Sequence, residues 1–365
     1  MVENKILIVG PSWIGDMVMA QSLFITLRQL NPDAIMDVLA PKWSRPLLQR
    51  MPEVNEAIEM PVGHGSIGIG KRWRLAKWLQ RRSYQQAIIL PNSLKSALVP
   101  WFAGIPLRTG WRGEMRYGLI NDLRHLDKRQ YPLMVQRFNA LAYPAGKTLS
   151  ERQPVPLLQV DREHYSPLRE AFSLFGHGRV LALCPGAEFG PAKRWPAQHY
   201  ADVARNKIEQ GWQVWLMGSG KDRDIAEAIV GYLDRAQQSC CRVLAGRTTL
   251  AQVIDLLAWA DAVVSNDSGL MHISAALRKP LMVVYGSSSP DFTPPLHEHA
   301  AIVRNSLDCS PCFQRECLFG HLKCLHELSP RQVIEALDGL LSRPENAAIA
   351  SVVNHGEMEP RKADG

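Results

Sequence analysis

The stretch Asp261-Ala-Val-Val-Ser-Asn266-Asp267-Ser268-Gly269-Leu270-Met271-His272 places an apolar strand directly before the start of a helix. Asp267 and Ser268 are residue types that favour helix N-caps, and Gly269 allows another molecule to approach the backbone closely. A helix that begins at the carboxyl end of a buried strand presents unpaired N–H groups and the positive end of its dipole, which attract phosphate. The turn therefore indicates either a phosphate site for a nucleotide-type ligand or an ordinary capped turn between strand and helix.

Strand and helix patterns alternate on both sides of this turn. The first half has strand patterns at 5–9, 34–39 and 87–90 and helix patterns at 14–30 and 133–145. The second half has strand patterns at 180–184, 213–217, 262–265 and 281–285, with helices between them. This alternation predicts an α/β protein with two Rossmann-like domains whose facing sheet edges form a ligand-binding cleft. The polar, proline-containing stretch 146–156 predicts domains at 1–150 and 151–343, and residues 344–365 have the composition of a disordered tail.

Composition supports a globular protein with more than one core. The chain has 365 residues, of which 46% are hydrophobic and 21% are charged, and this length exceeds the usual size of one domain. No apolar run approaches the roughly 18 to 20 residues that a membrane helix needs. The first residues lead directly into the strand pattern at 5–9 without the features of a signal peptide, so we expect a cytoplasmic location.

Charge is distributed unevenly between the two halves. Residues 1–150 contain 20 Lys and Arg against 10 Asp and Glu, whereas residues 151–365 contain 22 against 25. Six of the N-terminal cations lie in a segment without acids that has helical periodicity: Lys71, Arg72, Arg74, Lys77, Arg81 and Arg82. Such a basic amphipathic helix suits an anionic membrane surface or a phosphorylated lipid, but it also suits the solvated face of a helix packed on a core. No recognisable nucleic-acid-binding motif accompanies the charge, so we expect no nucleic-acid partner.

The first strand-to-helix turn carries a carboxylate that could act as a base. In Gly10-Pro-Ser-Trp-Ile-Gly-Asp16, Asp16 lies at the mouth of the strand 5–9 and in the positive field of the following helix. The alternative is that Asp16 only caps that helix. Asp16 is nevertheless the best-placed candidate base in the expected cleft.

Two loops of the second domain have the composition of phosphate-binding segments. The first is Cys184-Pro-Gly-Ala-Glu-Phe-Gly-Pro-Ala-Lys-Arg-Trp-Pro196, in which Lys193 and Arg194 follow glycines and precede a helix, as a diphosphate requires. The second, Gly218-Ser219-Gly220, is too short to be specific. The segment 65–72 resembles a P-loop only as far as Lys71, because Arg72 stands where a Mg²⁺-binding hydroxyl is needed and no strand pattern precedes it.

Four of the seven cysteines lie close together, at Cys309, Cys312, Cys317 and Cys324. In a cytosolic chain this grouping does not predict a disulfide framework. The spacing is not that of a zinc ribbon or a ferredoxin. Bound zinc and reduced structural thiols therefore remain alternative interpretations.

Six motifs together resemble the ADP-heptose:lipopolysaccharide heptosyltransferases of glycosyltransferase family 9, and the likeness runs from about residue 5 to residue 341. They are long and unusual in composition, which makes the resemblance specific, although the segment 309–324 departs from some members. The motifs are Gly10-Pro-Ser-Trp-Ile-Gly-Asp16, Pro91-Asn-Ser-Leu-Lys-Ser-Ala97, Arg108-Thr-Gly-Trp-Arg-Gly-Glu-Met-Arg-Tyr-Gly118, Cys184 to Pro196 as quoted above, Asn266-Asp-Ser-Gly-Leu-Met-His272 and Tyr285-Gly-Ser-Ser-Ser-Pro-Asp-Phe-Thr-Pro-Pro295.

The resemblance implies a GT-B fold and a metal-independent, inverting transfer of L-glycero-D-manno-heptose from ADP-heptose. The acceptor would be the first heptose of the lipopolysaccharide inner core, on heptosylated Kdo-lipid A at the inner face of the inner membrane. By the same resemblance Asp16 is the base and Lys193 stabilises the leaving diphosphate. The donor-binding residues would be Gly186, Glu188, Lys193, Arg194, Gly218, Ser219, Asp267, Ser268, Gly269 and His272, and the acceptor-binding residues Lys95, Arg112 and Arg116.

Three alternatives keep the same architecture but change the activity. Another heptosyltransferase would differ only in its acceptor. A nucleotide-sugar epimerase would act on the donor alone and would have little use for a basic N-terminal surface. A non-catalytic nucleotide- or lipid-binding protein would need no base at the position of Asp16.

Overall fold

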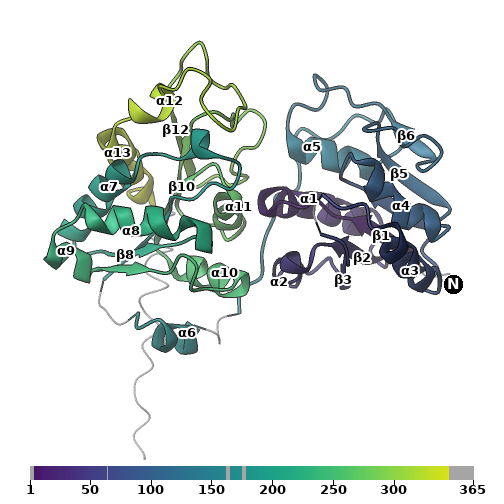
Figure 1. Ribbon diagram of the computed structural model, residues 1–365, viewed down its shortest axis with the longest axis horizontal. Helices are drawn as coiled ribbons and strands as arrows, with labels where there is room; N and C mark the ends of the chain where they lie inside the picture. Colours follow the sequence, from purple (N-terminus) through teal and green to yellow (C-terminus); the bar gives the residue numbers. More distant parts are fainter. Residues whose placement is uncertain (1–3, 64, 162–164, 175–177, 345–365) are drawn as a thin grey trace, which may run out of the picture. The chain divides into compact units, whose positions relative to one another are not determined.

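The computed structural model describes residues 4–63, 65–161, 165–174 and 178–344 (Figure 1). The chain divides into two compact units, and each is described below by itself. Unit 1 comprises Met1–Val160 with Ser289–Leu296, and unit 2 comprises Asp161–Ser288 with His297–Gly365. The tail expected at 344–365 lies, from residue 345 onward, outside the described residues.

Unit 1 contains a six-stranded parallel sheet in the order β3-β2-β1-β4-β5-β6. Its strands are β1 Lys5–Val9, β2 Ile35–Ala40, β3 Glu56–Glu59, β4 Gln86–Ile89, β5 Leu107–Trp111 and β6 Asp122–Arg124. Its helices are α1 Ile14–Leu30, α2 Arg45–Leu48, α3 Ile69–Gln80, α4 Leu94–Phe102 and α5 Met134–Asn139, with short 3-10 turns at Lys42–Ser44 and Ala140–Ala142.

Unit 2 repeats this topology with a second six-stranded parallel sheet, in the order β12-β11-β10-β7-β8-β9. Its strands are β7 Val180–Cys184, β8 Gln213–Leu216, β9 Cys241–Val243, β10 Ala262–Asn266, β11 Leu281–Tyr285 and β12 Ala300–Arg304. Its helices are α6 Tyr165–Ala171, α7 Ala197–Glu209, α8 Arg223–Gly231, α9 Arg235–Ser239, α10 Leu250–Trp259, α11 Gly269–Ala276, α12 Lys323–His326 and α13 Pro330–Leu341, with 3-10 turns at Pro191–Lys193 and Gly220–Asp222.

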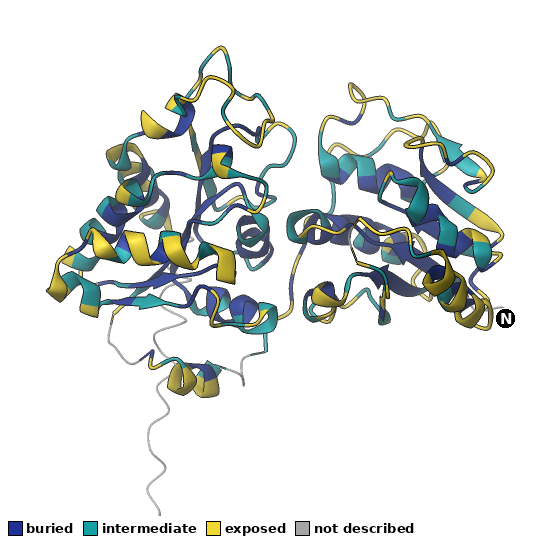
Figure 2. Ribbon diagram, in the orientation of Figure 1, coloured by how far each residue is buried: buried dark blue, intermediate teal, exposed yellow. Residues whose placement is uncertain are grey.

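The central strands form because their side chains are apolar on both faces, as parallel strands covered by helices on both sides require. Every residue of β10 and β11 is buried, and β1 is buried from Ile6 to Val9. In unit 1, α3 and α4 share one apolar core with the strands, whereas α1 packs with α5. In unit 2, α7, α8 and α13 share a core with the strands. Figure 2 shows the buried strands between helices whose outer faces are exposed. The expected α/β fold with two Rossmann-like units is confirmed.

The division between the units differs from the boundary expected at residue 150. The side chain of Gln21 on α1 accepts a hydrogen bond from the Leu157 N–H at 3.0 Å and donates one to the Leu157 carbonyl at 2.8 Å. The Ser22 hydroxyl donates to the Pro154 carbonyl in the same way. These contacts hold the segment after residue 150 on unit 1, because a buried polar side chain needs partners and the passing backbone provides them.

Unit 1 also includes Ser289–Leu296, which follows β11 in the sequence. The Phe292 carbonyl accepts a hydrogen bond from the Met134 N–H at 3.0 Å, at the start of α5. The guanidinium of Arg137 lies 4.6 Å from the centre of the Phe292 ring, a cation–π contact. No break in composition marks this return of the chain to unit 1.

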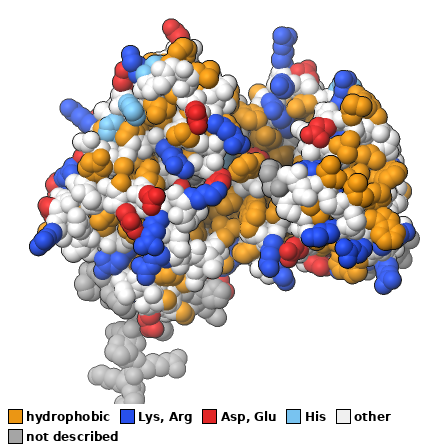
Figure 3. All heavy atoms as spheres, in the orientation of Figure 1, with side chains coloured by type: hydrophobic (Ala, Val, Ile, Leu, Met, Phe, Trp, Pro, Cys, Tyr) orange, Lys and Arg blue, Asp and Glu red, His pale blue; other side chains and the backbone are white. Residues whose placement is uncertain are grey.

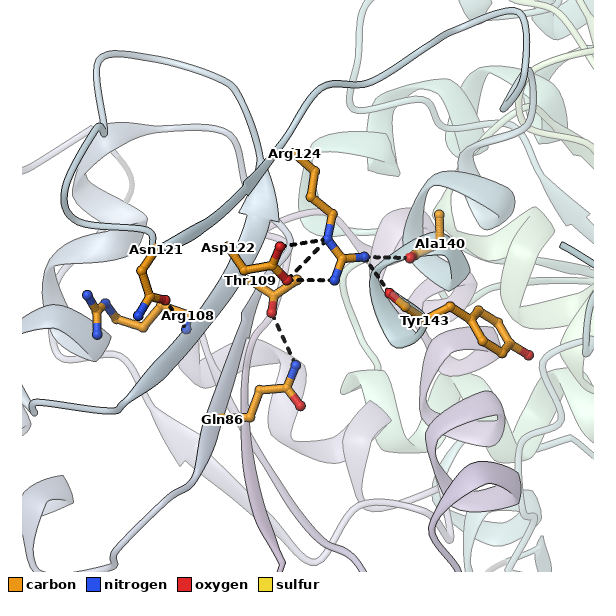
Figure 4. A network of polar contacts seen from close by, with 8 residues as sticks. All are labelled: Gln86, Arg108, Thr109, Asn121, Asp122, Arg124, Ala140 and Tyr143. Atoms are coloured by element: carbon orange, nitrogen blue, oxygen red, sulfur yellow. Dashed lines mark hydrogen bonds and ion pairs between the residues drawn. The ribbon is translucent and has the colours of Figure 1, made fainter. Parts of the chain in front are cut away.

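A polar network closes the β6 edge of unit 1 (Figure 4). Arg124 donates to both carboxylate oxygens of Asp122 and to the carbonyls of Ala140 and Tyr143. Burial works to raise the pKa of Asp122, but the bonds from Arg124 and Thr109 outweigh it and lower that pKa. The network joins this three-residue strand to the end of α5, so β6 is held by side chains as well as by its ladder.

Candidate functional site

The strand order of each unit reverses direction at one place, and ligands of open α/β sheets bind beside that switch point, at the carboxyl ends of the strands. In unit 2 the switch point lies between β7 and β10, which are neighbours although β10 begins 78 positions after β7 ends in the chain. The loop 185–196 follows β7, and the turn Asp267–Ser268 follows β10. The two sequence motifs of the candidate donor site therefore meet at one edge of the sheet.

An ion pair joins these two motifs. The Lys193 ammonium donates to the Asp267 carboxylate at 2.5 Å, and the exposed fractions of the two side chains are 16% and 4%. Asp267 is thus almost enclosed, whereas the lysine side chain keeps contact with solvent. The Lys193 ammonium also lies 5.0 Å from the centre of the Phe189 ring. An acidic partner and an aromatic face hold the cation in one place at the switch point.

A buried asparagine fixes the loop that carries Lys193. The Asn266 side-chain oxygen accepts hydrogen bonds from the Trp195 N–H at 3.1 Å and the Tyr200 hydroxyl at 3.0 Å, and its amide donates to the Pro185 carbonyl at 2.6 Å. Trp195, Tyr200 and Asn266 are all fully buried. Asn266 therefore locks both ends of the loop to β10, which fixes the backbone that positions Lys193.

The helix α11 begins as its N-terminal sequence predicts, but its cap is incomplete. Ser268 is the N-cap residue, yet its side chain makes no capping hydrogen bond; its hydroxyl lies 3.3 Å from the Ser265 hydroxyl instead. Gly269 is the first helical residue. The turn is therefore not an ordinary capped turn, because no side chain of the N-cap residue bonds the first backbone N–H groups of α11. The positive end of the α11 dipole lies beside the buried Asp267, next to the Lys193 cation.

His272 lies one turn into α11 and is buried. Burial lowers its pKa to about 4; Lys193 also lowers it, and Asp267 opposes the shift. The imidazole is therefore neutral at neutral pH. A neutral histidine beside Lys193 adds no further positive charge to this region.

The remaining expected donor residues lie on the loops after β7 and β8. Asp222 occupies the space beside two of them: a Cβ added at Gly186 would lie 2.4 Å from its carboxylate, and one added at Gly218 would lie 2.8 Å from its Cβ. The Asp222 carboxylate accepts hydrogen bonds from the Ser219 N–H and hydroxyl at 2.9 and 2.7 Å. These glycines are needed so that Asp222 can tie the two loops together.

Two charged residues of these loops already have partners within unit 2. The Glu188 carboxylate accepts from Lys221 at 2.5 Å, and both side chains are exposed. Arg194 donates to the Ala187 carbonyl at 3.3 Å and lies 3.9 Å from Asp222. Arg194 therefore braces its own loop, while Lys193 is the cation held at the switch point.

The cysteine-containing segment contributes a cation that the sequence motifs did not reveal. The guanidinium of Arg315 lies 5.3 Å from the centre of the same Phe189 ring that Lys193 contacts. The Arg315 carbonyl accepts from the Ala192 N–H at 3.1 Å, one residue before Lys193. The pair Lys193 and Arg194 identified the loop 185–196 in the sequence, but no local sequence pattern connects that loop with Arg315.

The four clustered cysteines are free thiols. Burial, and then the neighbouring Cys312, Cys309 and Cys317, raises the pKa of Cys324, whereas backbone N–H groups lower the pKa of Cys317. Among the described residues, no three or more His, Cys, Asp or Glu side chains gather in a way that could hold a metal ion.

Unit 1 has its own switch point, between β1 and β4. Asp16 lies in the first turn of α1, which follows β1, and it is partly buried. The N-cap residue of α1 is Trp13, so the interpretation of Asp16 as the N-cap is wrong. Lys95 lies in the first turn of α4, which follows β4, and it is also partly buried. Both side chains belong to helices that begin at the carboxyl edge of the sheet.

The two arginines expected to bind acceptor lie after β5 and differ sharply in exposure. Arg112 is exposed, and its guanidinium lies 3.5 Å from the His125 ring. Arg116 is 1% exposed, and burial lowers its pKa to about 10. It donates to the Pro91 carbonyl at 2.6 Å, the Ser96 hydroxyl at 3.1 Å and the Trp111 carbonyl at 2.5 Å.

These contacts enclose the Arg116 side chain within unit 1. Its guanidinium is occupied by the loop before α4 and by the end of β5, so it ties these two segments together. Glu114 supports the same arrangement, since its carboxylate accepts from the Leu94 N–H at 2.7 Å at the start of α4. An exposed and a buried arginine in one motif look alike in the sequence, which is why this distinction was missed.

The chain is similar to known heptosyltransferases over most of its length. The family described as Glycosyltransferase family 9 (heptosyltransferase) matches residues 72–323. Lipopolysaccharide heptosyltransferase 2 of Escherichia coli K12 is 52% identical over 346 residues, which cover 93% of this chain and 99% of that protein. Lipooligosaccharide heptosyltransferase 2 of Haemophilus influenzae is 45% identical over 348 residues, covering 93% and 100%.

A solved structure agrees with these relatives. The structure of E. coli ADP-heptose lps heptosyltransferase II is similar at a TM-score of 0.84 and 50% identity, covering 92% of this chain and 98% of that one. This similarity confirms the GT-B fold that the motifs implied. The chain belongs to glycosyltransferase family 9, the heptosyltransferases.

Proposed function

We propose that this enzyme transfers L-glycero-D-manno-heptose from ADP-heptose to the first heptose of the lipopolysaccharide inner core, with inversion at the anomeric carbon. The observation that carries the proposal is the Lys193–Asp267 pair at the switch point of unit 2, in a chain 52% identical to a lipopolysaccharide heptosyltransferase 2. An ammonium ion held at the carboxyl edge of a Rossmann-like sheet is suited to a nucleoside diphosphate.

In this proposal unit 2 binds the donor. Lys193 contacts the diphosphate, and Asp267, too enclosed to meet an anion itself, orients that lysine. The uncapped start of α11 at Ser268 and Gly269 supplies backbone N–H groups to the same phosphates. Arg315, which contacts the same Phe189 ring, adds a second cation. Gly186, Gly218 and Ser219, tied by Asp222, shape the rest of the donor loops. Glu188 and Arg194 belong to the loop after β7, and His272 follows Gly269 on α11 as a neutral group.

The transfer needs one base and one stabilised leaving group. The acceptor hydroxyl attacks the anomeric carbon, Asp16 takes the hydroxyl proton, and the bond from that carbon to the diphosphate oxygen breaks. ADP leaves with the bonding electron pair, and its added negative charge is stabilised by Lys193 and Arg315. ADP is a weaker base than a sugar alkoxide, so no strong general acid is required.

The acceptor side belongs to unit 1 in this proposal. Lys95 and Arg112 provide positive charge for an anionic glycolipid, heptosylated Kdo-lipid A, and Arg116 holds the loops that carry them. We also propose that the enzyme works in the cytoplasm at the inner face of the inner membrane, where such an acceptor is exposed. Among the described residues, the structure has no helix long and apolar enough to cross a membrane.

The test is a transfer assay with purified protein, ADP-heptose and a lipopolysaccharide acceptor that ends at the first heptose. We expect ADP release and heptose gain in equal amounts, together with an acceptor product of inverted anomeric configuration. ADP release without heptosylated acceptor, or epimerised donor without ADP, would contradict the proposal. An acceptor that lacks all heptose serves as the control, because transfer to it would indicate another family specificity. Chelator treatment should leave turnover unchanged if the two cations are sufficient.

A further inference from the structure

The part of unit 1 that contains α3 and α4 has a long stretch of sequence without acids. No Asp or Glu occurs between Glu59 and Glu114, and this segment contains nine Lys and Arg. It includes the helices α3 and α4, which pack side by side and share the core of unit 1. All charged residues of these two helices themselves are therefore basic.

Apolar side chains are exposed on the same helices. The exposed fractions of Ile67, Ile69 and Trp73 are 56%, 59% and 49%, and Trp101 on α4 is 45% exposed. Figure 3 shows hydrophobic side chains gathered over α3 and α4, bordered by basic ones. Isolated exposed apolar residues are ordinary on a protein surface, but a contiguous group of this kind marks an interaction site.

The arrangement on α3 is ordered along the helix. Ile69, Trp73 and Lys77 follow one another at intervals of four residues, which places them in one row on the exposed side. The Lys77 ammonium lies 5.7 Å from the centre of the Trp73 ring. Arg74 lies beside this row and Arg81 continues it, so the row is apolar at its start and basic at its end.

The segment before α3 is pinned in place by a buried arginine. Arg72 is 4% exposed, and its Nε donates to the Ile67 carbonyl at 2.6 Å. This bond holds the backbone of the loop against the helix while the Ile67 side chain remains outside. Arg72 and Arg82 have internal partners, since Arg82 pairs with Glu56 and Asp37. Within the described part of the chain, Arg74, Lys77 and Arg81 form no ion pair with an acid.

We propose that the α3 face, defined as Ile67, Ile69, Trp73, Arg74, Lys77 and Arg81, docks on a bilayer of anionic phospholipid. An anionic bilayer complements this face both in charge and in the distribution of apolar side chains. A helix with a row of tryptophan and isoleucine and only basic neighbours lies in the plane of an anionic membrane, with its apolar side chains at the headgroup boundary. A purely basic groove would suit nucleic acid, but exposed isoleucines would have no contact there. The inference rests on the proposed function, since it names the surface by which this enzyme would reach a lipid-anchored acceptor.

The test uses the full chain and vesicles that contain no lipopolysaccharide. Phosphatidylcholine vesicles with added phosphatidylglycerol should sediment the protein, vesicles of phosphatidylcholine alone should not, and high salt should release it. Each basic residue near an anionic surface contributes about fivefold to partitioning, so R74A/K77A should bind about 30-fold more weakly. W73A should bind these vesicles about tenfold more weakly, because it removes apolar area from the surface that enters the headgroup boundary.

Matched controls separate this surface from general charge and from the active site. K128A/R129A removes two exposed cations elsewhere in unit 1, and Y232A removes an exposed aromatic of unit 2; both should bind vesicles as the unaltered protein does. Transfer to detergent-dispersed acceptor should be unchanged in W73A, which also shows that the variant is folded. Equal binding to both kinds of vesicle, or unweakened binding by W73A and R74A/K77A, would overturn the docking surface. Vesicle binding without heptose transfer would contradict only the proposed function.

Discussion

Asp16 is the residue on which the proposed proton transfer depends. It lies in the first turn of α1, where the helix dipole stabilises its anion, and it is not the N-cap. We predict that Asp16→Asn lowers kcat about 10³-fold, because a positioned base contributes roughly 10²- to 10⁴-fold. ADP affinity, measured by calorimetry, should stay within about twofold. A variant with near-normal kcat would remove Asp16 from this role.

Lys193 and Arg315 share Phe189 but differ in enclosure, and their variants should differ accordingly. Lys193 is held by Asp267, so Lys193→Ala should lower kcat by about 10² to 10³, the usual cost of removing a charge-stabilising donor. Arg315 is exposed, and Arg315→Ala should lower kcat by about two- to fivefold. Arg223→Ala, an exposed arginine paired on α8, is the control and should have no effect on kinetics. Unchanged kinetics in Arg315→Ala would leave Lys193 as the only diphosphate cation.

His272 makes the stability of the protein sensitive to acid. Its pKa is lowered from the ordinary value of 6.5 to about 4, so the unfolded chain takes up a proton first as the pH falls. The stability is complete above pH 6.5 and is lost progressively towards pH 4. The lowered pKa of His272 thus makes the free energy of unfolding about 2 kcal/mol smaller at pH ~5 than at neutral pH.

The free energy of unfolding, measured in urea, should therefore fall by about 2 kcal/mol less between neutral pH and pH ~5 in His272→Gln than in the unaltered protein. His297, whose pKa is also lowered to about 4, remains in both proteins and cancels in the comparison. Parallel pH profiles for the two proteins would show that His272 does not carry the effect.

At the scale of elements, Arg116 joins the loop before α4 to the end of β5. Arg116→Lys keeps the charge but cannot reach the Pro91 and Trp111 carbonyls together. We predict a loss of about 2 to 3 kcal/mol in the free energy of unfolding, as buried acceptors are left unpaired. The acceptor KM should rise while ADP affinity is unchanged. Arg112→Lys is the matched exposed control, and a loss of similar size there would contradict the assignment.

The elements also differ in how far their sequences determine them. The strands β1, β7, β10 and β11 are continuous apolar runs, and they were predicted with nearly the observed bounds. The strands β3, β6 and β9 are only three or four residues long, include Glu, Asp or Arg, and show no strand pattern. They lie at or near sheet edges, where pairing with a neighbour decides the conformation.

At the scale of the molecule, the two units should respond differently to the nucleotide. We predict that saturating ADP slows amide hydrogen exchange in the loop 185–196 and at the start of α11, and leaves the start of α1 in unit 1 unchanged. Ligand at 100 times its Kd stabilises the bound state by about 2.7 kcal/mol, which corresponds to about 100-fold slower exchange where the donor site must open. Protection confined to unit 1 would contradict the donor role of unit 2. ADP with Lys193→Ala is the matched control and should protect less.

The sequence by itself determined the α/β class, the central strands, the family motifs and the position of Asp16, because these depend on local periodicity and on short contiguous patterns. Only the tertiary structure decided which residues meet. Lys193 and Asp267 are 74 residues apart and come together because β7 and β10 are neighbours in the sheet. The burial of Arg116, unlike the exposure of Arg112 in the same motif, is likewise visible only in the tertiary structure. The side-chain environment depends on elements distant in the chain, and no local pattern contains that information.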